Sequence, residues 1–376
     1  MLNVGIVGGG INGMCIAWQL VQAGHQATVY EQNTAMSGTS SASSKLLHGG
    51  LRYLENFEFR LVKESLHERN QWLSRAPHLA KPLQLMLPVY KHSRRSRLAY
   101  AAGLKLYDVL ARGGNMPKSQ WMTFKQVKQS HPNINTQGLL GAFTFWDAQM
   151  DDLALGQWVA SQAKGLGTTV QEYTRVSSVG TQGTVQLASG QWVQHDVVVN
   201  AAGPWAQQLA AQSGLALRHQ LDLVRGSHLV LDAPCTQAWL LEVPNERQIF
   251  FVLPWKGQTL LGTTEVRHTL GEPVECSGEE KDYLLKAYEA YFPNQPYQVV
   301  GQFAGLRPLL KSAADPSKAT REYAIEQHAN TLLCWAANGP RPWPWPAKCA
   351  KNSLGKPNKP HNRSTHDIHY SPLSNR

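Results

Sequence analysis

The sequence lacks an apolar run of about 18 residues, the length that would indicate a membrane-spanning helix. It also lacks a basic leader, because the chain starts directly with a strand-like pattern over residues 2–8. We therefore expect neither a spanning helix nor a secretory signal, and a cytoplasmic location for the chain.

Cysteine is scarce and dispersed. The chain has 5 cysteines in 376 residues, and none of them forms a C-x-x-C pair. This spacing argues against a zinc site and against a disulfide scaffold. We interpret the cysteines as small buried residues and expect no metal.

The formal charge of +10 is unevenly distributed. Residues 339–376 contain seven Lys and Arg against one Asp, so the remainder has a modest positive excess that does not require a nucleic-acid partner. The same segment contains 7 of the 21 prolines and almost no aliphatic side chains. This composition predicts a disordered tail outside the core.

The first 31 residues have the pattern of a dinucleotide-binding unit. Residues 2–8 predict a strand, residues 11–24 a helix and residues 27–31 a second strand. Between the first strand and the helix, Gly8-Gly9-Gly10-Ile11-Asn12-Gly13 fits G-x-G-x-x-G, in which the glycines permit a tight turn, approach to a pyrophosphate and helix packing. Glu31 ends the second strand, where a carboxylate can bind ribose hydroxyls. The candidate residues here are Gly8, Gly10, Ile11, Asn12, Gly13, Glu31 and Gln32.

Further along, strand-like and helical patterns alternate. Residues 192–203 predict one buried strand that leaves into a small-residue turn, and residues 250–254, 259–264 and 298–301 predict an antiparallel sheet in a second layer. Helical spacing occurs over residues 60–74, 96–112, 153–165 and 279–292. Asp147, Asp151 and Asp152 precede the third of these helices, and we expect them to cap it.

The segment Thr39-Ser40-Ser41-Ala42-Ser43-Ser44-Lys45-Leu46-Leu47-His48-Gly49-Gly50-Leu51-Arg52-Tyr53-Leu54 resembles the flavin-binding signature of FAD-dependent glycerol-3-phosphate dehydrogenases. Similar motifs follow in order at residues 146–152, 200–205, 225–228, 254–255, 262–265, 305–309 and 320–323. The resemblance covers residues 1 to about 338.

This resemblance implies an α/β fold of the D-amino-acid-oxidase superfamily. A glutathione-reductase-like, FAD-binding Rossmann domain would contain an inserted α+β substrate domain with an antiparallel sheet. FAD would be the dinucleotide. The FAD-binding parts would be about 1–75, 150–215 and 305–338, the substrate-domain parts about 76–149 and 216–304, and the aberrant tail 339–376.

By the same resemblance, Thr39, Ser40, Ser44 and Leu47 would line the pyrophosphate and the flavin. Val176 would meet the adenine through its backbone. Gly203 and its neighbours Ala202 and Trp205 would pass beside the cofactor.

The implied substrate is glycerol 3-phosphate, whose dianionic phosphate is best held by guanidinium groups. Arg52, Arg307 and Arg321 are the candidates, and Tyr53 could orient a substrate oxygen. A base must take the C2 hydroxyl proton as hydride leaves C2 for flavin N5, giving dihydroxyacetone phosphate. His228 is the leading candidate and His48 the reserve, because imidazole titrates near neutral pH. A structural, hydrogen-bonded role for His228 is the alternative.

Residues 91–97 are rich in Lys and Arg and precede a helical run with leucines at 98, 104, 106 and 110. A basic amphipathic helix can lie on an anionic bilayer, and in the resembling dehydrogenases a comparable region docks on the inner face of the membrane, where electrons pass to quinone or another acceptor. A surface helix that packs its leucines on the core is an equal alternative.

The family pattern expects Gly-Gly-Lys-(Leu/Trp)-Thr-Thr after the strand that ends at Trp335. This sequence instead continues into a segment with recurrent prolines, which cannot form the closing helix. Because Trp is encoded only by TGG, a shifted frame starting at the last base of the Trp335 codon permits Gly-Gly-Lys-Trp-Thr-Thr followed by helix formers. We interpret residues from about 336 as an out-of-frame translation. An in-frame, Pro-rich disordered extension is the alternative.

Two other functions stay open at this stage. One is another amine or 2-hydroxy-acid oxidase of the superfamily, against which the segment at residues 39–54 argues. The other is an inactive, flavin-poor relic that results from the altered tail.

Overall fold

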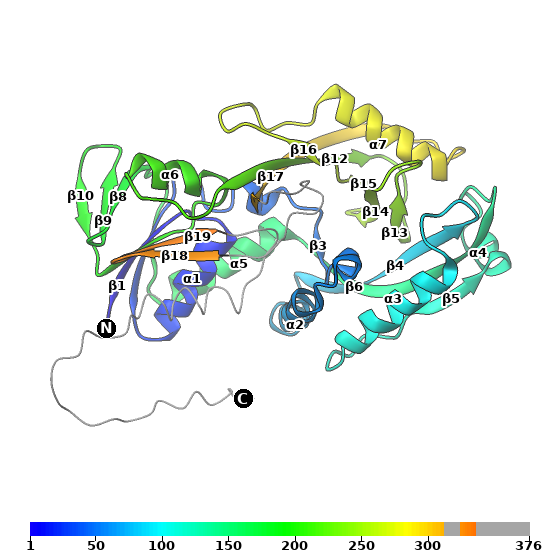
Figure 1. Cartoon of the computed structure of the whole chain (residues 1–376), viewed down its shortest axis with the longest axis horizontal. Helices are drawn as coiled ribbons and strands as arrows, with labels where there is room; N and C mark the ends of the chain where they lie inside the picture. The colour runs from blue at the N-terminus through cyan, green and yellow to red at the C-terminus, as the bar shows by residue number, and fades with distance from the viewer. Residues whose placement is uncertain (312–323, 336–376) are drawn as a thin grey trace.

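The computed structural model describes residues 1–311 and 324–335 of the chain, which fold around two large sheets (Figure 1). The blue N-terminal strands belong to a six-stranded sheet on the left of the view, and a ten-stranded sheet occupies the right. Among the described segments, every helix is too short or too polar to traverse a bilayer.

The six-stranded sheet is the Rossmann part of the molecule. All neighbouring strands are parallel except the first two, which are antiparallel. The strand order is β18 (Ala324–His328), β19 (Thr331–Trp335), β11 (Val197–Asn200), β1 (Asn3–Val7), β2 (Gln26–Tyr30) and β7 (Thr169–Gln171). The strands β1 and β2 and the helix between them confirm the predicted opening unit.

Side chains that alternate along the strands fill cores on both faces of this sheet. Ile6 and Val199 pack against α1 (Ile11–Gln22) and α5 (Asp152–Gly165). Val7 and Val198 point to the opposite face. That face is covered by α6 (Ala206–Gln212) and by the antiparallel strands β8 (Val176–Gly180), β9 (Thr184–Leu187) and β10 (Trp192–Gln194).

The ten-stranded sheet is antiparallel apart from the pairing of β4 with β13. Its main path is β16 (Val266–Arg267), β12 (Leu221–Leu231), β15 (Gln258–Gly262), β14 (Ile249–Trp255), β13 (Ala238–Glu242), β4 (Ala80–Tyr90), β6 (Leu139–Met150) and β3 (Leu46–Leu47). Two more strands pair at the sides, β17 (Val299–Leu310) with β12 and β5 (Gln120–Thr123) with β6. The predicted second layer with an antiparallel sheet is therefore confirmed.

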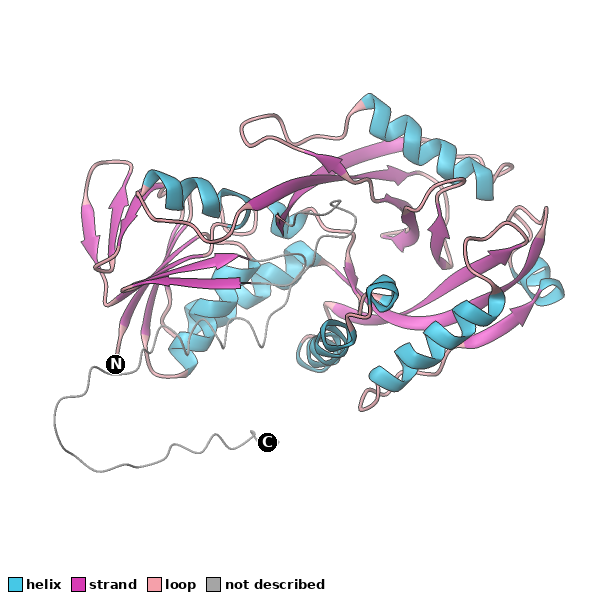
Figure 2. Cartoon of the chain, viewed as in Figure 1, coloured by secondary structure: helices cyan, strands magenta, loops and turns pink. Residues whose placement is uncertain are grey.

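Helices cover both faces of the ten-stranded sheet, as the cyan ribbons around the magenta strands show (Figure 2). Leu85 and Leu87 of β4 lie in a core with α2 (Phe59–Arg75) and α3 (Arg97–Leu110). Met86, on the opposite face, packs in a core with α4 (Phe124–Ser130) and α7 (Gly278–Tyr291). Both β3 and α2 contact this sheet although they come from the segment 1–75.

The predicted division into FAD-binding and substrate-domain parts stays a prediction.

One predicted strand is wrong. Residues 192–200 form two strands in different sheets, because the chain turns at His195 and Asp196. The buried His195 ring bonds Tyr30 Oη at 2.9 Å and Asn3 Oδ1 at 3.0 Å, and Asp196 accepts a hydrogen bond from the Asn3 N–H at 2.7 Å. These contacts tie the turn to β1 and β2, so the apolar run cannot continue as one strand.

Candidate active site

A cavity of about 560 Å³ lies where the two sheets meet. Its walls come from the first βαβ unit, the segment 36–53, the turn after β11, and strands β12 and β17. Three 3₁₀ turns contribute to it, Thr39–Ser41, Leu51–Asn56 and Gly203–Trp205. Segments distant in the sequence therefore meet at one site.

The glycine turn has the geometry that a pyrophosphate requires. Gly8 has a φ of +109°, and a Cβ on Gly13 would lie 2.0 Å from the Gly8 carbonyl oxygen, so neither position accepts a side chain. Glu31 Oε2 accepts a hydrogen bond from the Gly9 N–H at 2.7 Å, and the Ile11 N–H donates to Ser40 Oγ at 3.0 Å. The first turn of α1 also lines the cavity, which is where a helix N-terminus binds an anion.

The cofactor residues predicted from the sequence gather in this one place. With the exception of Gly13, which packs behind the turn, each lines the cavity: Gly8, Gly10, Ile11, Asn12, Glu31, Gln32, Thr39, Ser40, Ser44, Leu47, Val176, Ala202, Gly203 and Trp205. A cavity lined by glycines and small hydroxyl side chains fits a dinucleotide.

His228 is the buried imidazole of the site. Its Nε2 lies 2.8 Å from Ser44 Oγ, and its ring stacks on Phe303 with a centroid distance of 4.8 Å and an interplanar angle of 11°. Burial, then the positive charges of Arg307 and Lys45, hold the pKa of His228 well below its ordinary value. The ring is therefore neutral at neutral pH and can accept a proton.

Two of the three predicted phosphate ligands lie together. Arg307 donates to Thr263 Oγ1, and its Nη1 is 3.6 Å from Glu265 Oε1. Arg52 Nη1 is 3.7 Å from the same Glu265 oxygen. Glu265 was not among the predicted site residues, although it belongs to the motif at 262–265. Arg321 lies outside the described residues.

His48 and Tyr53 also line the cavity, with ring centroids 6.4 Å apart. The His48 side chain is exposed, whereas Tyr53 is buried. The turn between them is anchored by the Gly49 N–H, which donates to Tyr107 Oη at 2.8 Å and to Asp147 Oδ1 at 3.1 Å.

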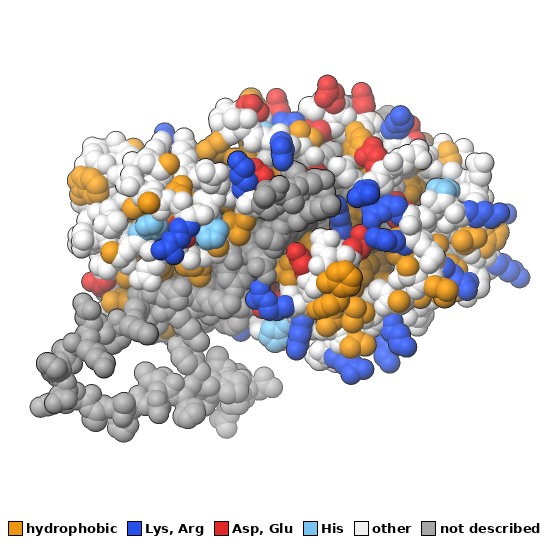
Figure 3. Space-filling view, viewed as in Figure 1, with side chains coloured by type: hydrophobic (Ala, Val, Ile, Leu, Met, Phe, Trp, Pro, Cys, Tyr) orange, Lys and Arg blue, Asp and Glu red, His pale blue; other side chains and the backbone are white. Residues whose placement is uncertain are grey.

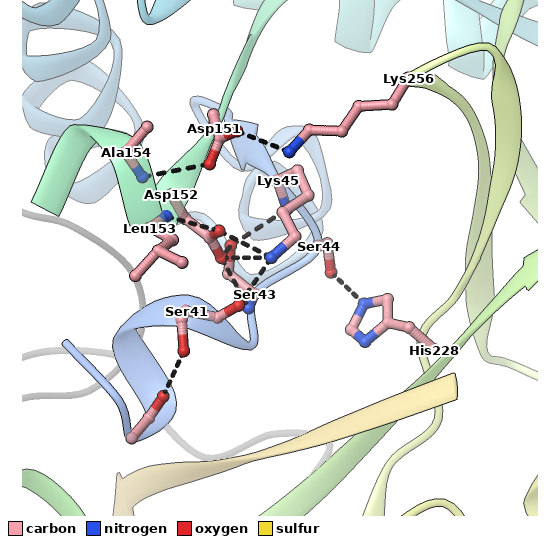
Figure 4. A network of polar contacts seen from close by, with 11 residues as sticks. Ser41, Ser43, Ser44, Lys45, Asp151, Asp152, Leu153, Ala154, His228 and Lys256 are labelled. Carbon is pink, nitrogen blue, oxygen red and sulfur yellow. Dashed lines mark hydrogen bonds and ion pairs between the residues drawn. The ribbon is translucent and has the colours of Figure 1, made fainter. Parts of the chain in front are cut away.

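The three aspartates before α5 have separate roles. Asp151 caps the helix as predicted, accepting a hydrogen bond from the Ala154 N–H at 3.1 Å. The cap interpretation is wrong for Asp147, which is buried in an ion pair with Arg69 at 2.9 Å. Asp152 is the first helical residue and forms a buried ion pair with Lys45 at 2.6 Å (Figure 4). The role of Lys45 could not be predicted from the sequence, because its partner is 107 residues away.

Comparison with known proteins agrees with this geometry. The family described as FAD dependent oxidoreductase matches residues 3–339. A glycerol-3-phosphate dehydrogenase of Pseudomonas aeruginosa is 36% identical over 357 residues, covering 90% of this chain and 67% of that protein. The aerobic glycerol-3-phosphate dehydrogenase of Escherichia coli K12 is 34% identical over 340 residues, covering 86% of this chain and 66% of that protein.

A solved structure shares the fold. The glycerol-3-phosphate dehydrogenase from Bacillus halodurans complexed with FAD superposes with a TM-score of 0.73 at 25% identity, covering 94% of this chain and 64% of that one. This chain spans about two thirds of the length of these relatives.

Proposed function

Because the chain belongs to the family of FAD dependent oxidoreductases, we propose that it oxidises sn-glycerol 3-phosphate to dihydroxyacetone phosphate with FAD as its cofactor. One observation carries this proposal: a buried neutral imidazole, two arginines and a dinucleotide turn line the same cavity. The names of the relatives from Pseudomonas aeruginosa and Escherichia coli support the same substrate.

The cofactor would be held mainly by backbone groups. The N–H groups at the start of α1, with the hydroxyls of Thr39 and Ser40, would bind the pyrophosphate, and Glu31 the ribose. The backbone of Val176 would meet the adenine. Ser44, Leu47, Ala202, Gly203 and Trp205 would line the flavin. When bound, FAD would supply flavin N5 as the acceptor of the hydride that leaves C2, with quinone or another compound as the final electron acceptor.

Substrate binding and proton removal would fall to side chains at the other end of the cavity. Arg52 and Arg307 would bind the phosphate by charge-assisted hydrogen bonds, with Arg321 as a third proposed ligand. Tyr53 would orient a substrate oxygen. His228 would take the proton from the C2 hydroxyl oxygen, because burial leaves its ring uncharged and shielded from water. His48 is the reserve base.

A substrate panel tests this proposal. The purified chain, supplied with FAD and an artificial electron acceptor, should oxidise glycerol 3-phosphate but not glycerol, 2-hydroxy acids or amino acids. The reason is that Arg52 and Arg307 would bind a phosphate group, which the other compounds lack. Turnover of an amine or a 2-hydroxy acid at a higher rate than glycerol 3-phosphate would contradict it and favour another oxidase of the superfamily.

We also propose a peripheral contact with an anionic membrane through α3. Leu104 of this helix is buried, but Leu98 is 75% exposed, and Leu106 and Val109 are also exposed. Figure 3 shows hydrophobic side chains on the face that carries α2 and α3, with Lys and Arg side chains around them. The chain should therefore sediment with anionic vesicles at low salt, and Leu98→Ser should weaken this binding. Equal binding to neutral vesicles, or none, would contradict the contact.

A further inference from the structure

The loop that carries Ser44 is fixed by a buried carboxylate that the proposed proton transfer does not use. Lys45 Nζ lies 2.6 and 2.8 Å from the two oxygens of Asp152, and these side chains are 8% and 3% exposed. Asp152 also accepts hydrogen bonds from the Ser43 N–H, the Ser43 hydroxyl and the Leu153 N–H. Figure 4 shows these donors converging on Asp152 from the loop and from the start of α5.

The backbone of Lys45 depends on this pairing. Its φ of +58° lies in the left-handed region, which few residues other than glycine adopt. Its Nζ also donates to the Ser41 carbonyl at 2.7 Å, and its own carbonyl accepts a hydrogen bond from the Met150 N–H at 2.9 Å. Since Ser44 directly precedes Lys45, the place of the Ser44 hydroxyl depends on this turn.

The Phe303 ring also connects Lys45 to His228. Its Nζ lies 4.9 Å from the centroid of the Phe303 ring, and the same ring stacks on His228. Among the described residues, three ion pairs surround His228. Lys45 of the loop pairs with Asp152 of α5, and Arg307 of β17 pairs with Glu265 in the turn after β15. Arg225, on the same strand as His228, pairs with Glu280 of α7. Of these, Arg307 and Lys45 are the two cations that act on its pKa.

We propose that Lys45 and Asp152 are a positioning pair for the proton acceptor: together they hold the Ser44 hydroxyl on His228 Nε2 and place one positive charge beside the imidazole. This inference rests on the proposed function. The charge opposes protonation of His228, so the resting ring stays uncharged down to lower pH. Asp152 pairs with the buried ammonium, because an unpaired charge in this place would be costly.

The test compares a charge-free pair with a conservative replacement. Lys45→Met/Asp152→Asn removes both charges without leaving an unpaired buried carboxylate, whereas Lys45→Arg keeps the cation. The double variant should retain FAD and lose on the order of 10- to 100-fold in kcat, because a displaced Ser44 no longer orients the ring. Its KM should change less. In the double variant, the acid limb of the pH profile of kcat/KM should move to higher pH. In Lys45→Arg, the acid limb should lie at the same pH as in the unaltered chain.

A second measurement does not depend on turnover. NMR titration of the His228 ring, assigned with His228→Gln, should show protonation at higher pH in the double variant than in the unaltered chain. An unchanged titration and an unchanged acid limb in a folded double variant would overturn the inference, as would a Lys45→Arg variant that behaves like the double variant. If the chain does not oxidise glycerol 3-phosphate but His228 titrates as expected, the proposed function fails and the positioning pair stands.

Discussion

At the scale of single residues, the end of the cavity that we propose for the phosphate contains two guanidinium groups that share one carboxylate. Arg52 and Arg307 both approach Glu265 Oε1, within 3.7 Å. A phosphate dianion would bring more negative charge to both arginines than this carboxylate supplies. On the proposed function, these residues would favour phosphorylated over neutral substrates.

Replacing Arg307 tests this preference. Arg307→Ala should lower kcat/KM for glycerol 3-phosphate roughly 30-fold, because a charge-assisted hydrogen bond to the phosphate is lost. This factor corresponds to about 2 kcal/mol of transition-state binding free energy. Steady-state kinetics with an artificial acceptor measures the change. Arg60→Ala, which removes an exposed arginine on α2, is the matched control and should be neutral. Unchanged kinetics of Arg307→Ala would remove this residue from the site.

The pH profile tests His228. Its pKa lies below 6.5 in the folded chain, so kcat/KM should hold its plateau down to pH 6.5 and fall only at lower pH, as the base becomes protonated. His228→Gln should reduce kcat by on the order of 10²- to 10⁴-fold. His48→Gln is the control with little expected effect. A large loss in His48→Gln with an active His228→Gln would assign the base to His48.

The same shift has a consequence for stability. The unfolded chain binds a proton at His228 near pH 6.5, but the folded chain binds it only at lower pH. The contribution of His228 to the free energy of unfolding is therefore complete above pH 6.5 and decreases as the pH falls below that value.

At the scale of elements, the turn between β1 and α1 controls the cofactor end. Gly13→Ala should destabilise the fold by about 1–3 kcal/mol through overpacking, since the added Cβ would meet the Gly8 carbonyl oxygen. It should also abolish flavin retention. Gly103→Ala, in α3, meets nothing within 4 Å and should stabilise the helix by about 1 kcal/mol. Denaturant unfolding and flavin absorbance measure both, and a flavin-bearing, fully stable Gly13→Ala would contradict the packing.

The elements also show which features the sequence could predict. The opening βαβ unit and the helices α2, α3, α5 and α7 follow from local periodicity, so they were predicted correctly. The long strands β4 and β6 were missed, because their pairing joins Ala80 to Met150 and depends on distant partners. The pairing of Lys45 with Asp152 was missed for the same reason. A lysine in a hydroxyl-rich segment does not reveal a carboxylate 107 residues away.

At the scale of the whole molecule, the cavity needs both sheets. Gly8 and Glu31 come from the Rossmann part, while His228 and Arg307 come from the ten-stranded sheet. The FAD dependent oxidoreductase family matches residues 3–339, and the residues after Trp335 lie outside the described part of the chain. The interpretation of that tail as an out-of-frame translation stays a prediction.

Sequencing the DNA across the Trp335 codon tests it. We expect a displaced base within the few codons upstream. A chain carrying the restored Gly-Gly-Lys-Trp-Thr-Thr turn should bind FAD more tightly than the chain as it stands, because the turn would supply backbone N–H groups near the flavin. An intact frame, with equal FAD affinity in both chains, would support a Pro-rich extension instead.

The most direct test of the account is the visible absorption spectrum of the purified chain with FAD, recorded anaerobically before and after addition of glycerol 3-phosphate. We expect a bound-flavin spectrum that bleaches with glycerol 3-phosphate and not with glycerol. A chain that holds no flavin, or a bound flavin that glycerol 3-phosphate leaves oxidised, would contradict it.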